Sequence, residues 1–203
     1  MARLSRFVAV AVLLGGATAS LSGCTGDSDP VVTPSPSVTV VTPSPSASPS
    51  PTALSDEELL ALIPEEARGQ DFVSASNFAK FFVGAYTGLF VDGADVGLYR
   101  ALSAEGCSYC ASALANAVET AQAGAHSEGG VFSFPDLLGR GGLRDDGFTY
   151  VAQPFALTDA TTFGPEGEPL GSGRGGTGDV GVKMRFDDGA WRVYAVEFSF
   201  DDE

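Results

Sequence analysis

The sequence is poor in the residues that hold metals and bind nucleic acids. It has three cysteines, a single histidine (His126) and 11 lysine or arginine residues, against 26 aspartate or glutamate residues. A structural zinc site needs four ligands, and proteins bind nucleic acid largely through lysine and arginine contacts to phosphate. These shortages predict that the chain has no metal, no cofactor and no nucleic-acid partner.

Long hydrophobic runs are missing beyond the N-terminus, so no later segment is expected to span a membrane. The N-terminus itself has the pattern of an export signal: Arg3 and Arg6 precede a short apolar run over residues 7–14. Cys24 follows directly after Leu-Ser-Gly, which predicts a lipoprotein signal peptide over residues 1–23. The Cys24 thiol would then carry a diacylglyceryl group with chains such as palmitate, which would hold the protein at the extracytoplasmic face of the cell membrane.

Two alternatives to a lipoprotein signal remain. Cys24 would be an ordinary cysteine if the leader were a plain secretory signal. Residues 7–23 would be a retained membrane helix if they were not removed, but their glycine, serine and threonine residues disfavour this.

Residues 24–54 are predicted to form a linker, because they are rich in proline, serine and threonine and contain no aromatic residue that could build a core. Proline at this density favours extended polyproline II, which suits a spacer between a membrane and a folded domain. Removal of the leader takes away Arg3 and Arg6 and leaves nine basic and 26 acidic side chains, a formal charge of −17. We therefore expect a folded domain with an acidic, solubilising surface.

Residues 55–203 are predicted to form one α+β domain, in which N-terminal helices pack on a curved antiparallel sheet of about four strands. Helical spacing of apolar residues predicts helices over 55–63, 74–91, 95–102 and 107–123, the second capped by Ser74 or Ser76. After Gly129 the period changes to two. Strands are expected over 131–135, 148–157, 180–186 and 191–200, with Asp188-Gly189 as a hairpin turn. Pro154 inside its strand indicates an edge or a bulge.

The order of three helices, a hairpin and a Trp-x-Val-x-x-Val strand (Trp191, Val193, Val196) resembles the nuclear-transport-factor-2-like cone. A more specific pattern is Ile63 to Gly69, then the aromatic helix, then Ala101 to Ala104 leading into Cys107-x-x-Cys110. It resembles a family of actinobacterial lipoproteins with a domain of unknown function, over about residues 60–200. The resemblance implies the cone, the lipid anchor and a paired Cys-x-x-Cys, and it brings no activity or ligand with it.

Cys107 and Cys110 are the two cysteines left once Cys24 is lipidated, and in an exported protein they should be oxidised to a disulfide. Their position at the start of a helix supports two interpretations. The pair is either a structural staple or, since a thiol at a helix N-terminus is reactive, a thiol-disulfide exchanger. The second interpretation lacks the preceding strand of a thioredoxin arrangement.

Four residues are candidates for lining a pocket: Glu197, Tyr150, Tyr86 and Trp191. Alternation along the last strand places Trp191, Val193, Ala195 and Glu197 on one face, so Glu197 would lie in the cone if that face points inward. His126 is expected in a solvated loop, and the glycine-rich run over residues 171–176 is expected to be a flexible loop because no helix follows it.

Together these features predict a membrane-anchored lipoprotein whose domain binds a ligand or an envelope partner, such as a cell-wall component or a membrane protein. An enzyme that uses a carboxylate or tyrosine in the cone is the alternative. No catalytic residue can be assigned from the sequence.

The lipid anchor can be tested by mass spectrometry of the protein isolated from its native membrane. We expect a mature N-terminus at Cys24 that carries a diacylglyceryl group, and Cys24→Ser should abolish the modification because the thiol is its acceptor. An unmodified thiol at position 24, or an intact leader in a cytosolic fraction, would contradict the prediction.

Overall fold

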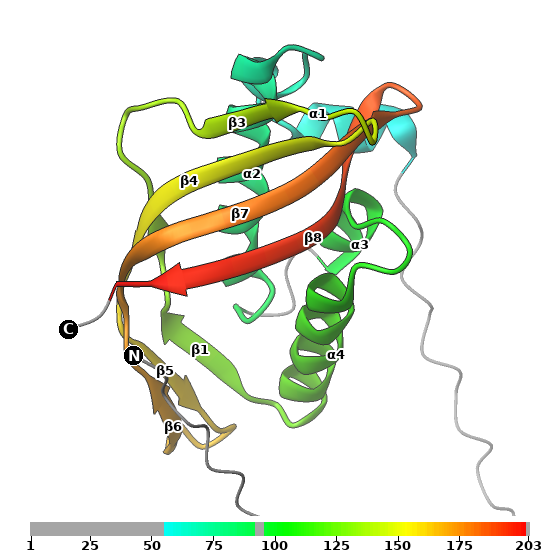
Figure 1. Cartoon of the computed structure of the whole chain (residues 1–203). Coiled ribbons are helices and arrows are strands. Elements are labelled where there is room, and N and C mark those ends of the chain that lie inside the picture. Colours follow the sequence, from blue (N-terminus) through cyan, green and yellow to red (C-terminus); the bar gives the residue numbers. More distant parts are fainter. Residues whose placement is uncertain (1–54, 92–95, 202–203) are drawn as a thin grey trace, which may run out of the picture. The chain divides into compact units, whose positions relative to one another are not determined.

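A computed structural model describes residues 55–91 and 96–201, so the predicted signal peptide, Cys24 and the linker lie outside the described residues. Helices come first and strands follow, which confirms the α+β class (Figure 1). The helical elements are α1 (Asp56–Leu62), η1 (Glu65–Ala67), α2 (Phe72–Gly88), α3 (Val96–Leu102) and α4 (Ser108–Gln122). The strands are β1 (His126–Gly129), β2 (Phe132–Ser133), β3 (Arg140–Leu143), β4 (Thr149–Leu157), β5 (Ala160–Phe163), β6 (Pro169–Gly173), β7 (Gly176–Asp187) and β8 (Ala190–Phe200).

Helix starts follow from local capping. Ser55 and Glu58 form a capping box at α1, as the sequence predicts. The cap of α2 is different from the prediction: the Asp71 carboxylate accepts hydrogen bonds from the N–H groups of Val73 and Ser74, so the helix begins at Phe72. Asp71 caps the helix because its side chain stands one residue before the first helical turn, where two unpaired N–H groups point at it.

The main sheet has five antiparallel strands in the order β2-β4-β7-β8, with β3 beside β2 on the same side of β4. The β7–β8 hairpin turns at Asp188 and Gly189, both with positive φ, as the Asp-Gly pair predicts. Figure 1 shows α2 behind this sheet, with α3 and α4 beside β8.

Pro154 lies at a local edge of β4 and not at a bulge, so the edge alternative of the prediction is the correct one. It pairs with Asp179 within an unbroken β4–β7 ladder. On the other side of β4, β3 begins opposite Ala152 and β2 ends opposite Ala156, so residues 153–155 have no partner strand there within the described part of the chain. The proline therefore stands where the second neighbouring ladder is interrupted, which a residue without an N–H tolerates.

The prediction that Trp191, Val193, Ala195 and Glu197 share one face of the last strand is wrong, because β8 contains a β-bulge. Lys183 of β7 faces Ala195, but the next residue, Met184, faces Val193, so Tyr194 is an extra residue in β8. An extra residue reverses the alternation of side chains. Trp191 and Val193 point inward, and so does Val196, whereas Glu197 is exposed on the outer face.

A second sheet of three strands, in the order β1-β5-β6, was not predicted. The β5–β6 hairpin continues the paired strands β4 and β7, so Gly171 to Gly173 lie in β6 and not in a flexible loop. His126 starts β1, and its ring stacks on Phe163 with 5.7 Å between centroids.

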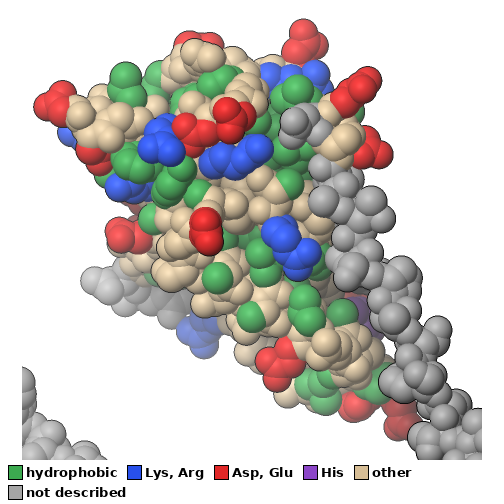
Figure 2. All heavy atoms as spheres, turned by 90° about the vertical axis from the view of Figure 1, so that its right-hand side faces the viewer, with side chains coloured by type: hydrophobic (Ala, Val, Ile, Leu, Met, Phe, Trp, Pro, Cys, Tyr) green, Lys and Arg blue, Asp and Glu red, His purple; other side chains and the backbone are tan. Residues whose placement is uncertain are grey.

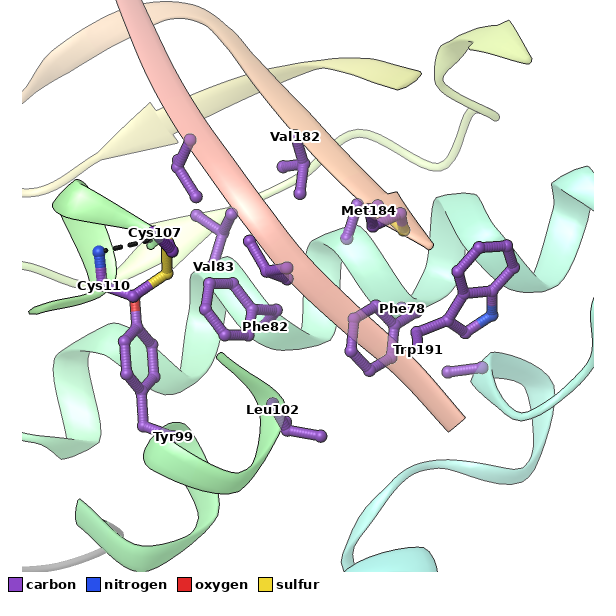
Figure 3. Packing of buried hydrophobic residues seen from close by; sticks show 14 of the residues in the cluster. Phe78, Phe82, Val83, Tyr99, Leu102, Cys107, Cys110, Val182, Met184 and Trp191 are labelled. Atoms are coloured by element: carbon purple, nitrogen blue, oxygen red, sulfur yellow. Dashed lines mark hydrogen bonds between the residues drawn. A yellow bond between two sulfur atoms is a disulfide. The ribbon is translucent and has the colours of Figure 1, made fainter. Parts of the chain in front are cut away.

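The core fills the space between the helices and the inner face of the main sheet. Phe78 and Phe82 of α2 are fully buried in the core, as Figure 3 shows, and the centroid of the Phe78 ring lies 6.4 Å from that of Trp191 in β8. Phe82 stacks on Tyr99 at 4.5 Å, and the indole N–H of Trp191 donates to the carbonyl of Gly69 at 2.8 Å. The aromatic residues predicted from helical spacing thus join α2, α3 and β8 in one core.

The surface is polar where Figure 2 shows it, with charged side chains of both signs among scattered hydrophobic ones. Among the described residues, no helix is long and apolar enough to cross a membrane.

The core assignment predicts different outcomes for two leucine substitutions. Leu102→Ala should lower the free energy of unfolding by about 2–5 kcal/mol, because Leu102 is fully buried and a cavity would remain. Leu143→Ala is the matched control: its side chain is 74% exposed, and we expect a change below about 0.5 kcal/mol. Urea unfolding of both variants measures the difference, and equal losses would contradict the assignment.

Candidate functional site

The outer face of the main sheet, which faces the viewer in Figure 1, has no helix packed on it among the described residues. A groove of about 420 Å³ lies on this face, and Arg140, Arg144, Tyr150, Lys183 and Glu197 line it, with small residues between them. We call it the outer groove. It is open to solvent, in contrast to the closed cavity that a cone would provide.

Strand register explains why the sheet is hollow at this point. In one cross-strand row Arg140 stands beside Ala152, followed by Gly181 and Glu197. Residues directly opposite in antiparallel strands point to the same face. The row therefore has a cation at one end, a carboxylate at the other, and a floor of one methyl group and one hydrogen between them.

The neighbouring row forms one wall of the outer groove. Tyr150 stands beside Lys183, which stands beside Ala195. The Lys183 ammonium lies 5.5 Å from the Tyr150 ring centroid and 3.8 Å from the Asp146 carboxylate. The Tyr150 hydroxyl donates to the same carboxylate at 2.8 Å. This hydrogen bond, the Phe148 N–H and the charge of Lys183 hold the pKa of Asp146 below its ordinary value, so Asp146 stays ionised at neutral pH.

Two opposite charges in the outer groove have no ion-pair partner among residues 55–91 and 96–201. Arg140 is paired with Asp179 at 2.9 Å, and Lys183 with Asp146. The guanidinium of Arg144 lies only over the Tyr150 ring, 6.0 Å from its centroid. Glu197 makes no hydrogen bond or ion pair within the described part of the chain. The groove is thus lined by one cation, Arg144, and one carboxylate, Glu197, that have no ion-pair partner among the described residues.

The four predicted pocket residues are not brought together. Tyr150 and Glu197 share the outer groove. Trp191 is buried beneath a second depression near Phe186. Tyr86 lines a third groove, at the end of α2. No cluster of three or more metal-binding side chains occurs in the part of the chain that the structure describes.

Sequence reasoning missed Arg140, Arg144 and Lys183. The alternation of Lys183 and Arg185 with buried residues in β7 is visible in the sequence and signals an outward basic row. Arg140 had no such signal, because β3 contains two glycines and has the composition of a loop.

The interior that a cone would leave open is filled by aromatic residues. Tyr86, Tyr109, Phe132 and Phe198 contact one another with ring centroids 5.5–6.3 Å apart. Burial raises the pKa of Tyr86, Tyr99 and Tyr109 above the ordinary value of a phenol, so all three stay neutral. The Tyr99 hydroxyl is buried and has no hydrogen-bond partner among the described residues.

Cys107 and Cys110 form a disulfide, and both residues are buried. Cys107 is the N-cap of α4, and its sulfur accepts the N–H of Cys110 at 3.3 Å. The segment just before it is tied to β8, since the Ala104 N–H donates to the carbonyl of Val193 at 2.8 Å. The disulfide thus stabilises the first turn of α4, directly after the segment that pairs with β8. Burial also shields its sulfurs from an attacking thiolate.

No protein-family model matches the sequence, and no curated protein matches it. Among solved structures, the intermembrane-space region of the chloroplast protein ARC6 is similar, with a TM-score of 0.51 and 14% identity. The similarity covers 66% of this chain and 99% of that structure. Aln2 from a Streptomyces species has a TM-score of 0.39 and 16% identity, over 64% of this chain and 90% of Aln2. The likeness to ARC6 shows a shared α+β fold and nothing about activity.

Burial of the disulfide predicts resistance to mild reduction. Folded protein treated with a dilute dithiol should show no labelled Cys107 or Cys110, whereas both should be labelled after unfolding in denaturant. Cys107→Ser combined with Cys110→Ala, which keeps a side-chain cap on α4, should lower the free energy of unfolding by about 2 kcal/mol. Rapid reduction of the folded protein, with turnover of a disulfide substrate, would instead identify an exchanger.

Proposed function

We propose that the chain is a lipid-anchored extracytoplasmic lipoprotein whose folded domain binds a short zwitterionic, peptide-like ligand in the outer groove. The observation that carries the ligand class is a pair of opposite charges, Arg144 and Glu197, which have no ion-pair partner among the described residues and line one groove whose floor is made by Ala152 and Gly181.

The anchor rests on the sequence. Arg3, Arg6, the apolar run and the Leu-Ser-Gly before Cys24 support export and lipidation. The buried Cys107–Cys110 disulfide is consistent with an oxidising compartment. The pattern from Ile63 to Cys110 supports membership of the actinobacterial lipoprotein family that it resembles, with a cone-like domain.

The size of the outer groove favours a ligand of a few residues. Strands β3 and β8 are three inter-strand spacings, or about 14 Å, apart, and Arg144 stands four residues, or about 13 Å, beyond Arg140, so its Cα is about 19 Å from that of Glu197. An extended tripeptide is about 10 Å long, and the side chains of Arg144 and Glu197 can reach the remaining distance from either end. The carboxylate of such a peptide would pair with Arg144, a geometry for which guanidinium is suited, and its ammonium would pair with Glu197. A short peptide released from the cell wall or from a membrane protein has this chemistry.

Two observations favour binding over catalysis in this groove. The groove is open, so water screens its charges, whereas acid–base catalysis relies on a sheltered site. The ionisable pair within hydrogen-bond reach, Tyr150 and Asp146, is exposed, and its phenol donates to a carboxylate held in its charged form. The arrangement orients the Tyr150 ring as a wall for a ligand.

A peptide series tests the proposal. The probe is tri-L-alanine, compared with its N-acetylated and C-amidated forms, titrated calorimetrically into the full chain in a polyoxyethylene detergent. Glu197→Gln should weaken binding of the free peptide about five-fold and leave the N-acetylated peptide unaffected, because only the free ammonium pairs with Glu197. Arg144→Gln should weaken binding of the free peptide and leave the C-amidated peptide unaffected, because only the free carboxylate pairs with Arg144.

A filling variant provides the control for the site. Gly181→Phe places a ring over the floor, and the added Cβ has room, since its nearest neighbour is the Glu197 carbonyl oxygen at 3.9 Å. Gly181→Phe should abolish binding of the peptide without loss of stability, because phenylalanine is well suited to strands. Equal effects of Glu197→Gln on free and acetylated peptides, or unchanged binding by Gly181→Phe, would refute the proposal.

A further inference from the structure

A second groove, distinct from the outer groove, lies where the end of α2 and the end of α4 meet the three-stranded sheet. It has a volume of about 430 Å³. We call it the hydroxyl groove, because five of the side chains that line it carry an aliphatic hydroxyl: Thr87, Thr120, Ser127, Thr162 and Ser172. Two aromatic rings, Tyr86 and Phe90, complete its helical wall.

None of the residues that line the hydroxyl groove, all within the described part of the chain, carries a charge. This is unusual for a protein with 26 acidic side chains and a formal charge of −15. Strand alternation accounts for it, since Glu128 lies between Ser127 and Gly129 in β1 and is exposed on the opposite face. An ionic ligand would find no counter-charge here.

The sheet wall is built from two cross-strand rows of small residues. One row is Ser127, Thr162 and Gly171, and the other is Gly129, Ala160 and Gly173. An added Cβ at Gly171 or Gly173 would meet open space, so the backbone of β6 is accessible to a ligand. A surface of this kind presents backbone amides and hydroxyls without bulky side chains between them.

Hydrogen bonds hold the hydroxyl groove in shape. The Thr87 hydroxyl donates to the carbonyl of Gly130 at 2.6 Å, and the Ser127 N–H donates to the carbonyl of Phe90 at 3.0 Å. The hydroxyls of Ser127 and Thr162 bond to each other at 3.0 Å. Each hydroxyl can donate once and accept twice, so this network orients the groups and leaves acceptor positions and one donor free for a ligand.

The Tyr86 and Phe90 rings are only partly buried, and their centroids are 5.1 Å apart. They offer an apolar surface beside the hydroxyls. A ligand that fits this wall must have an apolar C–H face and several uncharged hydroxyl groups around it. From this geometry we propose that the hydroxyl groove binds a neutral saccharide, with one sugar ring against Tyr86 and Phe90 and its hydroxyls on the β1–β5–β6 wall.

The test uses neutral oligosaccharides as probes: cellotetraose, maltotetraose and the tetramer of N-acetylglucosamine. The full chain is kept in a polyoxyethylene detergent, which carries neither sugar nor charge, and binding is measured by saturation-transfer NMR. At least one probe should bind, with its ring protons receiving the transfer. If none of the three binds, the proposal is overturned.

Two filling variants separate the grooves. Gly171→Phe should reduce saccharide binding about ten-fold or more, because its ring occupies the hydroxyl groove beside Thr162. Gly181→Phe is the matched control and should leave saccharide binding unchanged, just as Gly171→Phe should leave tri-L-alanine binding unchanged. Loss of saccharide binding in both variants, or in neither, would overturn the assignment, whatever the outcome for the peptide.

A smaller substitution tests the same groove in case the Gly171→Phe variant does not fold. Thr162→Val removes one hydroxyl from the groove, and Thr161→Val removes the neighbouring hydroxyl on the opposite face of β5. We expect weaker saccharide binding only for Thr162→Val, with equal thermal unfolding temperatures for the two variants. Equal binding by both would contradict a role of the hydroxyl wall.

Discussion

The extra residue in β8 determines what each face of the main sheet presents. Because Tyr194 bulges out of the ladder, Val193 and Val196 both point into the core, and Ala195 and Glu197 both point to the outer face. Without the bulge, Glu197 would face the core and the outer groove would lose its carboxylate end. A local irregularity in one strand therefore supports both the closed core and the dipolar outer face.

The same division explains why the interior is no binding site. Phe78, Phe82, Tyr99 and the ring cluster around Phe132 occupy the space between helices and sheet. Their burial supplies the apolar contact area that a domain of this size needs to fold. Both grooves lie outside the core, where glycine and alanine leave the backbone uncovered.

Much of the fold could be predicted from the sequence, and the failures have physical causes. The β7–β8 hairpin follows from alternation and the Asp-Gly turn, and α2 from its aromatic spacing. The bulge could not be predicted, because the alternation of residues 191–200 is equally compatible with a regular strand. The prediction for Pro154 left an edge and a bulge open, because single-sequence patterns do not show which side of a strand lacks a partner. The β5–β6 hairpin was missed because Gly171 and Gly173 have low strand propensity, and pairing with Thr162 and Ala160 overrides it.

The candidate sites were less predictable than the fold, since each depends on register. Tyr150 and Glu197 are 47 positions apart and meet only because β7 aligns them across Lys183 and Gly181. Tyr86 lines a groove, but Ser127 and Thr162, which line it too, belong to strands that could not be predicted from the sequence.

The strict alternation of β4 and β7 has an evolutionary consequence. Along these strands Val151, Val180 and Val182 maintain the fold, and their immediate neighbours Ala152 and Gly181 form the floor of the groove. Adjacent residues in the sequence are thus under different constraints, one set for packing and the other for the shape of the groove. Single exchanges on the solvent side of these strands can therefore alter the floor of the outer groove while the packed side, and with it the architecture, stays intact.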